Sequence, residues 1–358
     1  MDRSQPINGN FKSLFWRLVQ GANKYSFIAI AIFLGCTCSV EHPEQDPEIE
    51  KIISFNVDSN QLIADLSEFT KIEHPFGSER QKELSDWIKQ RAASMGLIAE
   101  VEGFSAQTPN PFLFRNPSAP ADNTLSKNGY NVKATLSGSK TCNIIFASHY
   151  DTKTLEEGSY LGANDSASSS AGLFHLANII QNLIPDENDR CSFTFYWFDG
   201  EESVLPDWND GEENYTPPIK DNTYGSRYTA SKTEKCSKGI CLAGSNSPIK
   251  ALIVLDMIGS PNIKITTDLN SSPRLVKLMK DSAKKLGLSK TMGSFSTAIE
   301  DDHIPFKNLG LDVLDIIDFQ NTSHWHKTSD TFDKVSTQSI IEAIKIAAKI
   351  ATEENSRY

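Results

Sequence analysis

The stretch NIIFASHYD, from Asn143 to Asp151, decides the fold of this chain. A short apolar run, followed at once by histidine and aspartate, is typical of a strand that is buried on both faces. Two further runs have the same form, since FTFYWF is followed by DGEE, which ends at Glu202, and ALIVL is followed by Asp256. Because the carboxyl ends of parallel strands meet at one edge of a sheet, we expect these polar side chains to converge there.

Helical patterns alternate with these strands along the chain. Over 78–95, Leu84, Trp87 and Ile88 recur at helical spacing, and Gly96 follows as a stop. The other expected elements are strands at 98–105, 130–136, 143–147, 193–198, 251–255 and 311–317, and helices at 166–184, 225–234, 272–286 and 336–352. The first two strands form a predicted hairpin around the Pro- and Asn-rich stretch 107–129. The sequence therefore predicts a single α/β domain over 56–358, with a central mixed, mainly parallel β-sheet flanked by helices on both faces.

The N-terminal residues 1–36 have the pattern of a targeting segment. Basic residues precede an apolar stretch over 25–34, and Gly35-Cys36 resembles the cleavage site of a bacterial lipoprotein signal. A plain signal peptide and a short uncleaved anchor are the alternatives, and the acidic stretch 37–55 is then expected to be a tether. Each alternative predicts an exported chain in the periplasm or cell envelope, either lipid-anchored at Cys36 or secreted. Any membrane attachment is expected only through this lipid or signal anchor.

The formal net charge of −11 argues against a nucleic-acid partner, which requires a basic surface. The sequence does not predict an oligomeric state. An exported chain permits disulfides, and a bridge between Cys236 and Cys241, which flank a short loop, is plausible. A bridge between Cys142 and Cys191 is less favoured because it requires adjacent strands. Free buried thiols are the alternative.

Acidic residues and histidines gather at the predicted strand ends and at the start of one predicted helix. They are His149, Asp151, Asp165, Glu201, Glu202, Asp256 and His326. One histidine with carboxylate oxygens suits zinc, and three protein ligands leave a coordination position open for a substrate. Asp165 is expected at the start of the helix 166–184, where the helix dipole favours a carboxylate. Of the adjacent pair Glu201 and Glu202, one can bind the metal while the other moves protons.

Three histidines are set apart from this group. His324 is an alternative to His326 as the ligand, because each lies next to Trp325. His303 can be purely structural within its DDHIPF loop. His175 lacks a supporting acid nearby in the sequence and is expected to be a packing residue.

The chain resembles the zinc aminopeptidase family that also contains the animal-type glutaminyl-peptide cyclotransferases, or glutaminyl cyclases. The resemblance extends from about Pro75 to the C-terminal helix and is greatest to the cyclase branch. It is carried by SHYDTK (148–153), GANDSA (162–167), FDGEE (198–202), YGSR (224–227), VLDMIGSPN (254–262), DDHIPF (301–306) and WH (325–326). The resemblance implies a zinc aminopeptidase-like, phosphorylase/hydrolase-like fold.

The cyclase pattern implies a role for each matching residue. Asp165, Glu202 and His326 would bind one zinc per chain. Glu201 would be the general acid/base, and Asp256 and Asp301 its polar partners. For the substrate pocket, the pattern implies Trp325 as a wall, Ile299 as a lining residue and Trp208 near the place of a further tryptophan.

Two positions depart from the pattern. The sequence has Asp315 where similar cyclases carry a histidine, and this change would allow Asp301 and Asp315 to share a proton. It also lacks the family's aromatic residue at about Asn321.

The resemblance implies cyclisation of the N-terminal glutamine of peptides or proteins to pyroglutamate, with release of ammonia. The rival is an aminopeptidase with two zinc ions, in which His149 and Asp256 complete the second site and Asp165 bridges both metals. A noncatalytic binding protein is disfavoured because Glu201 and all the implied ligands are retained.

Overall fold

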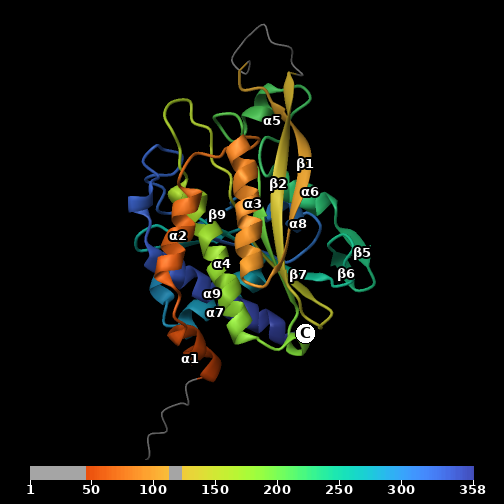
Figure 1. Cartoon of the computed structure of the whole chain (residues 1–358), viewed down its shortest axis with the longest axis vertical. Coiled ribbons are helices and arrows are strands. Elements are labelled where there is room, and N and C mark those ends of the chain that lie inside the picture. The colour runs from red at the N-terminus through yellow and green to blue at the C-terminus, as the bar shows by residue number, and fades with distance from the viewer. Residues whose placement is uncertain (1–45, 113–122) are drawn as a thin grey trace, which may run out of the picture. The chain divides into compact units, whose positions relative to one another are not determined.

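The computed structural model describes residues 46–112 and 123–358, and these fold around one six-stranded sheet (Figure 1). The strands are β1 (Ile98–Pro109), β2 (Thr124–Leu136), β3 (Asn143–His149), β4 (Ser192–Phe198), β7 (Ile249–Asp256) and β10 (Val313–Ile317), in the spatial order β1-β2-β4-β3-β7-β10. Strands β4, β3, β7 and β10 run parallel, while β2 pairs antiparallel with both β1 and β4. The predicted mixed, mainly parallel sheet is confirmed.

The central strands bury alternate side chains on opposite faces of the sheet. In β3, Ile144 and Phe146 belong to the larger apolar cluster, whereas Ile145 and Ala147 belong to a second cluster on the other face. Since both faces are buried, these strands carry continuous apolar runs rather than an alternating pattern.

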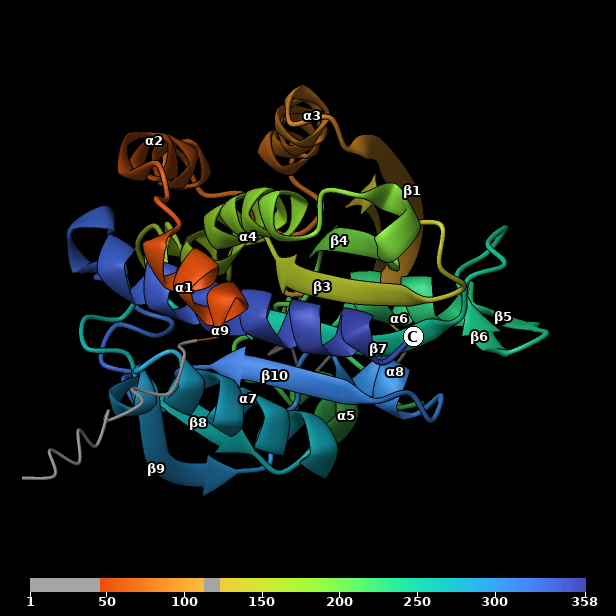
Figure 2. The same cartoon turned by 90° about the horizontal axis from the view of Figure 1, so that it is seen from below.

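Helices cover both faces of the sheet, as predicted. The larger cluster includes side chains from α1 (Pro47–Ser54), α2 (Ser59–Phe69), α3 (Glu79–Ser94), α4 (Ser169–Leu183), α7 (Pro273–Lys285) and α9 (Thr337–Ser356), and the second cluster includes side chains from α6 (Tyr224–Ser231) and α8 (Ile304–Lys307). Figure 2 shows α2, α3 and α4 together on one side of β3 and β4. Within the described ranges, none of the helices has the length and apolar character needed to cross a membrane.

The folded domain begins earlier in the chain than the sequence predicts. Helix α1 lies within the range 37–55 that was assigned to a tether, and its Ile49 and Ile52 are buried in the core. The sequence pattern does not reveal this short amphipathic helix because charged residues surround the two isoleucines. Asp46 caps the helix by accepting a hydrogen bond from the main-chain nitrogen of Glu48. The targeting segment 1–36 and Cys36 lie outside the described residues.

Several other elements differ from those that the sequence predicts. Strands β1 and β2 extend into the stretch 107–129 that was expected to be a connection, with Pro109 opposite Thr124. The sequence also missed α2, a short helix α5 (Asp210–Asn214), and the parallel pair β8 (Ile265–Asp268) and β9 (Met292–Thr297).

Both cysteine pairs form disulfides. Cys236 and Cys241 are the last residues of the two strands of a hairpin, β5 (Glu234–Cys236) and β6 (Gly239–Cys241), and are bonded to each other. Cys142 and Cys191, the pair that the sequence disfavoured, are also bonded. Each precedes a strand, and because β3 and β4 are parallel neighbours, the two cysteines lie side by side with their Cα atoms 4.9 Å apart.

Candidate active site

Polar side chains meet at the carboxyl ends of three neighbouring parallel strands. His149 is the last residue of β3, Glu201 and Glu202 follow β4 by a tight turn, and Asp256 is the last residue of β7. Gly200 has a φ of 72° in that turn, a conformation that side-chain-bearing residues rarely adopt. Asp151 secures the turn, since its carboxylate accepts hydrogen bonds from the main-chain nitrogens of Glu201 (3.0 Å) and Glu202 (3.2 Å). The predicted convergence at the sheet edge therefore occurs.

Asp165 lies in an irregular turn before α4 and not at the start of the helix. Its φ and ψ of −114° and 89° are not helical, and α4 begins four residues later at Ser169. Two groups hold it in place: the Tyr160 hydroxyl donates to Oδ2 at 2.9 Å, and Asp330 Oδ2 accepts from the Asp165 main-chain nitrogen at 3.1 Å. The expected helix-dipole effect is therefore wrong, because Asp165 precedes the helix and is held by Tyr160, five positions before it, and by the distant Asp330.

Asp165, Glu202 and His326 form the first of three groups able to hold a metal ion among the described residues. His326 Nε2 lies 3.1 Å from Glu202 Oε1 and 3.5 Å from Asp165 Oδ2. The second oxygen of Glu202 is buried without a hydrogen-bond partner. Two carboxylates and one imidazole at these distances, with an unpaired buried oxygen, fit a zinc ion.

His149, Asp165 and Asp256 form a second such group, which shares Asp165 with the first. His149 Nε2 lies 3.0 Å from Asp165 Oδ1 and 3.4 Å from Asp256 Oδ1. The shared aspartate places the two groups side by side, as a pair of metal ions bridged by one carboxylate requires.

Glu201 carries the carboxyl group best suited to move protons. Its side chain is 8% exposed and lines the pocket of about 400 Å³ that is described below. Burial raises the pKa of Glu201 well above its usual range; the charge of His149 opposes this shift, and the carboxylates of Asp301 and Glu202 reinforce it. Burial also raises the pKa of Asp256 to about 7, against the effect of its hydrogen bond with His149. A pKa of about 7, as at Asp256, lies near the value that general acid/base catalysis needs at neutral pH.

A pocket of about 400 Å³ opens over these groups. Its lining includes the predicted residues Asp165, Glu201, Trp208, Asp256, Ile299, Asp301, Trp325 and His326, together with Pro206, Asp207, Met257, Ala298, Glu300, Ile317 and Phe319. Trp325 stands at the rim with 37% of its surface exposed, and its ring meets that of Phe319 edge to face at 5.2 Å. The sequence missed Phe319, although an aromatic residue in the loop after the last strand of the sheet was a usable signal.

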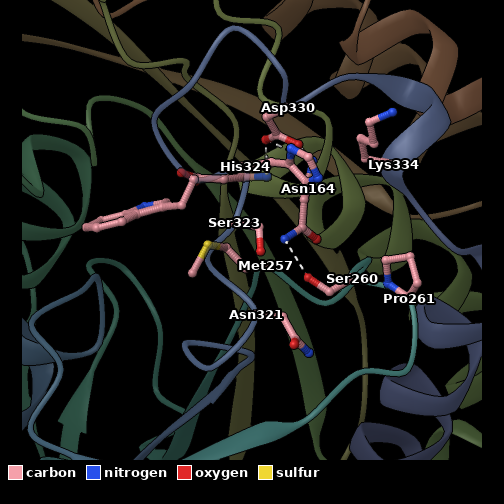
Figure 3. A pocket seen from close by; sticks show the side chains of 11 residues that line it. Asn164, Met257, Ser260, Pro261, Asn321, Ser323, His324, Asp330 and Lys334 are labelled. Atoms are coloured by element: carbon pink, nitrogen blue, oxygen red, sulfur yellow. Dashed lines mark hydrogen bonds between the residues drawn. The ribbon is translucent and has the colours of Figure 1, made fainter.

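A smaller polar pocket of about 180 Å³ adjoins the first and shares Asp165, Met257 and Trp325 with it. Figure 3 shows the Asn164 amide directed at the Ser260 hydroxyl in this pocket, with Asp330 and His324 nearby. His324 bonds to the Ser329 hydroxyl at 2.9 Å and lies in none of the three groups, so His326 is the histidine that lies beside Asp165 and Glu202.

Asp315, where the sequence departs from the cyclase pattern, lies behind the pocket. Its side chain is fully buried, and neither carboxylate oxygen has a hydrogen-bond partner. Burial raises its pKa well above the usual range, and the carboxylate of Asp301 adds to the effect. The two aspartates therefore belong to one buried, acidic region.

Comparison with protein families identifies the fold. The model of peptidase family M28 matches residues 131–351, more than half of the chain. The chain belongs to peptidase family M28. The family binds zinc, in agreement with the buried His and Asp groups of this M28 chain.

Its homologues include glutaminyl cyclases. A glutaminyl-peptide cyclotransferase-like protein of Bos taurus is 28% identical over 261 residues, or 67% of this chain and 61% of the relative. The glutaminyl-peptide cyclotransferase of Drosophila melanogaster is 28% identical over 243 residues, or 61% of this chain and 64% of the relative. The chain thus spans less than two thirds of the length of these curated relatives.

Solved structures show the same fold in two kinds of enzyme. A glutaminyl cyclase of an Acidobacteriales bacterium, 27% identical, superposes with a TM-score of 0.67 over 85% of this chain and 97% of that chain. A leucine aminopeptidase precursor from Bacteroides thetaiotaomicron superposes with a TM-score of 0.65 over 83% of this chain and 97% of that chain, at 18% identity. Since both kinds share the fold, the fold alone does not select the reaction.

Proposed function

We propose that this M28 chain is a glutaminyl-peptide cyclotransferase with a single catalytic zinc. The observation that carries the proposal is the partly enclosed pocket, which the apolar side chains of Trp325, Phe319 and Ile299 line together with the carboxyl group of Glu201. Such a pocket suits the short side chain of one N-terminal residue whose reacting groups lie close together. The similarity to glutaminyl cyclases supports the same reaction.

In this reaction the α-amine of the substrate attacks its own γ-amide carbon, a new carbon–nitrogen bond closes the ring, and the amide nitrogen leaves as ammonia. Zinc held by Asp165, Glu202 and His326 would supply positive charge that polarises the γ-amide carbonyl. Because the nucleophile belongs to the substrate itself, the main task of the protein is to hold a folded conformer.

Glu201 moves the proton in this scheme. Its raised pKa suits it to accept a proton from the attacking amine and return it to the departing ammonia. Asp301 also lines the pocket, and its Oδ2 is buried without a partner, so it can accept a hydrogen bond from the leaving amide nitrogen. Asp256, at the carboxyl end of β7, lines the same pocket and would orient the amine.

The second candidate is an aminopeptidase with two zinc ions. The observation that favours it is the complete second group of His149, Asp165 and Asp256. In that reaction Glu201 would activate water, and a peptide bond would be cleaved.

Mass spectrometry of a peptide that begins with glutamine separates the two reactions. The cyclase proposal predicts loss of the mass of one ammonia with the peptide chain intact, and no cleavage of a leucine anilide. Release of the first residue or of the aniline would overturn the cyclase and support the peptidase.

We further propose that the chain is exported to the periplasm or cell envelope, either lipid-anchored at Cys36 or secreted, where peptide and protein N-termini are its substrates. The basic and apolar segment before Gly35-Cys36 supports this proposal. Membrane fractionation of the wild-type chain and of Cys36→Ser tests the lipid anchor. We expect the wild type in the membrane fraction and the variant outside it.

A further inference from the structure

A third group of potential metal ligands lies in the core behind the pocket, apart from the two groups at the strand ends. Asp268 is the last residue of β8, His303 immediately precedes α8, and Asp315 is in the middle of β10. The three side chains are at most 2% exposed, and one ligand atom of each lies within 4.8 Å of those of the others. His303 Nε2 is 3.2 Å from Asp268 Oδ2. None of these residues belongs to the groups around Asp165.

Asp315 has no partner for its charge. Both of its carboxylate oxygens are buried without a hydrogen bond, and the same holds for His303 Nδ1. The neighbours Leu314 and Ile316 belong to the larger core cluster, so the Asp315 side chain points to the other face of the sheet, where His303 lies. A buried carboxylate without partners must either take up a proton or bind a cation, and the neighbouring donors of Asp268 and His303 favour the cation.

No lysine or arginine among the described residues is recorded as neutralising the buried carboxylate of Asp315. Among the ion pairs recorded for the described part of the chain, none joins Asp315, Asp301 or Asp302 to a lysine or arginine. All three aspartates are at most 3% exposed. A divalent cation bound by Asp315 and its neighbours would supply the missing charge.

Asp268 is already held in position to bind such a cation. Its Oδ1 accepts hydrogen bonds from the main-chain nitrogens of Asn270 and Ile299, each at 2.9 Å. Its Oδ2 accepts from the Ser271 hydroxyl at 2.7 Å and faces His303. Hydrogen bonds from neighbouring groups to a ligand side chain orient metal ligands in proteins. Here the bond from the main-chain nitrogen of Ile299 also connects the group to the pocket wall.

We propose that Asp268, His303 and Asp315 bind a divalent transition-metal cation, zinc being the one that their donors suit best. One imidazole and two carboxylates are ligands that zinc accepts, and the whole group is buried away from the pocket lining. The cation ties β8, the DDHIPF loop and β10 together, and thereby positions Asp301 at the pocket. This site does not depend on the proposed function, since a cyclase and a peptidase could both contain it.

Metal content of the purified full chain tests the proposal. Elemental analysis after growth with zinc and removal of loosely bound metal should show one equivalent fewer in Asp315→Asn than in the wild type. The matched control is His175→Gln, which alters another buried histidine that lies 3.2 Å from an aspartate oxygen but in none of the three groups. It should retain the full content.

His149→Gln identifies which site loses metal. This change breaks the second strand-end group only, so it lowers the content if the chain is a two-zinc peptidase and leaves it unchanged for a cyclase. In neither case should it remove the equivalent that Asp315→Asn removes. The double variant should therefore contain one equivalent fewer than His149→Gln alone.

Equal metal content in the wild type and Asp315→Asn overturns the proposal, and would mean that protons alone neutralise these carboxylates. If Asp315→Asn does not fold, zinc-edge anomalous diffraction from wild-type crystals replaces the comparison. A peak among Asp268, His303 and Asp315 supports the site, and a map with peaks only beside Asp165 refutes it.

Discussion

Two buried polar clusters in this protein differ in how their charges are satisfied. The cluster of Asp65, Arg91 and His175, which joins α2, α3 and α4, is paired internally. Asp65 Oδ1 accepts from Arg91 Nε and Gln61 Nε2, both at 2.9 Å, and Oδ2 accepts from Arg91 Nη2 at 3.1 Å and lies 3.2 Å from His175 Nε2.

The carboxylates in and around the candidate active site are the opposite case. Glu202 Oε2, Asp256 Oδ1 and Asp301 Oδ2 are buried without hydrogen-bond partners. A cluster whose partners are all within the protein stabilises the fold, whereas unpaired buried carboxylates indicate a place for a ligand or for proton transfer. Mutations should therefore affect stability at the first cluster and chemistry at the second.

The largest effect is expected from removing a zinc ligand. His326→Gln should lower the rate of ammonia release from a glutaminyl peptide by about 10⁴-fold, because several kcal/mol of transition-state stabilisation would be lost with the metal. Elemental analysis should show less bound zinc. His324→Gln is the control, since the side chain of this nearby histidine bonds to Ser329 and lies in none of the candidate groups, so the variant should retain zinc. Equal loss in both variants would contradict the assignment of His326.

Loss of the proton carrier should have the next largest effect. Glu201→Gln should lower kcat by about 10³-fold, within the range for removal of a general acid/base, and should leave zinc bound. Steady-state kinetics and metal content measured on the same preparation check both parts. Unchanged turnover would show that another group moves the proton.

At the paired cluster, the expected effect is on stability. Asp65→Asn should lower the free energy of unfolding by about 1.5–3 kcal/mol, because charged hydrogen bonds to Arg91 and His175 are lost. Urea denaturation measures the change. Asp86→Asn is the control: its partner Lys82 is one helical turn away on the exposed side of α3, and the cost should stay below about 0.5 kcal/mol. A similar loss in both variants would remove the distinction between buried and exposed pairs.

The smallest expected effect is a pH dependence of the difference in unfolding free energy between the wild type and Asp65→Asn. Burial disfavours the charge of Asp65, but hydrogen bonds from His175 and Arg91 hold its pKa below the ordinary value. A lowered carboxyl pKa stabilises the fold above the unfolded-state pKa of about 3.9, and this contribution disappears as the pH falls through the folded-state value. The stability gap between the wild type and Asp65→Asn should therefore shrink as the pH falls below about 4. A gap that widens in acid would contradict the lowered pKa.

Local patterns in the sequence predicted much of the fold and of the site. Continuous apolar runs located β3, β4 and β7, and the acids and histidines at their ends were placed at the sheet edge because strand direction determines where such residues meet. His175, by contrast, was expected to be a packing residue, because its partner Asp65 lies 110 positions away and on another helix. The Cys142–Cys191 bridge was disfavoured for the same reason, since it depends on which strands are neighbours.

By itself, the sequence determined the α/β class, the strands of the central sheet, the polar residues at their ends and the resemblance to a zinc enzyme family. Only the tertiary structure decided that His326 rather than His324 joins Asp165 and Glu202, that Asp165 lies in an irregular turn, and that Asp268, His303 and Asp315 form one buried group. The physical reason is that apolar periodicity and strand ends are local properties of the chain. Burial and the pairing of charges depend instead on residues far apart in the sequence, which only the folded chain brings within a few ångströms of one another.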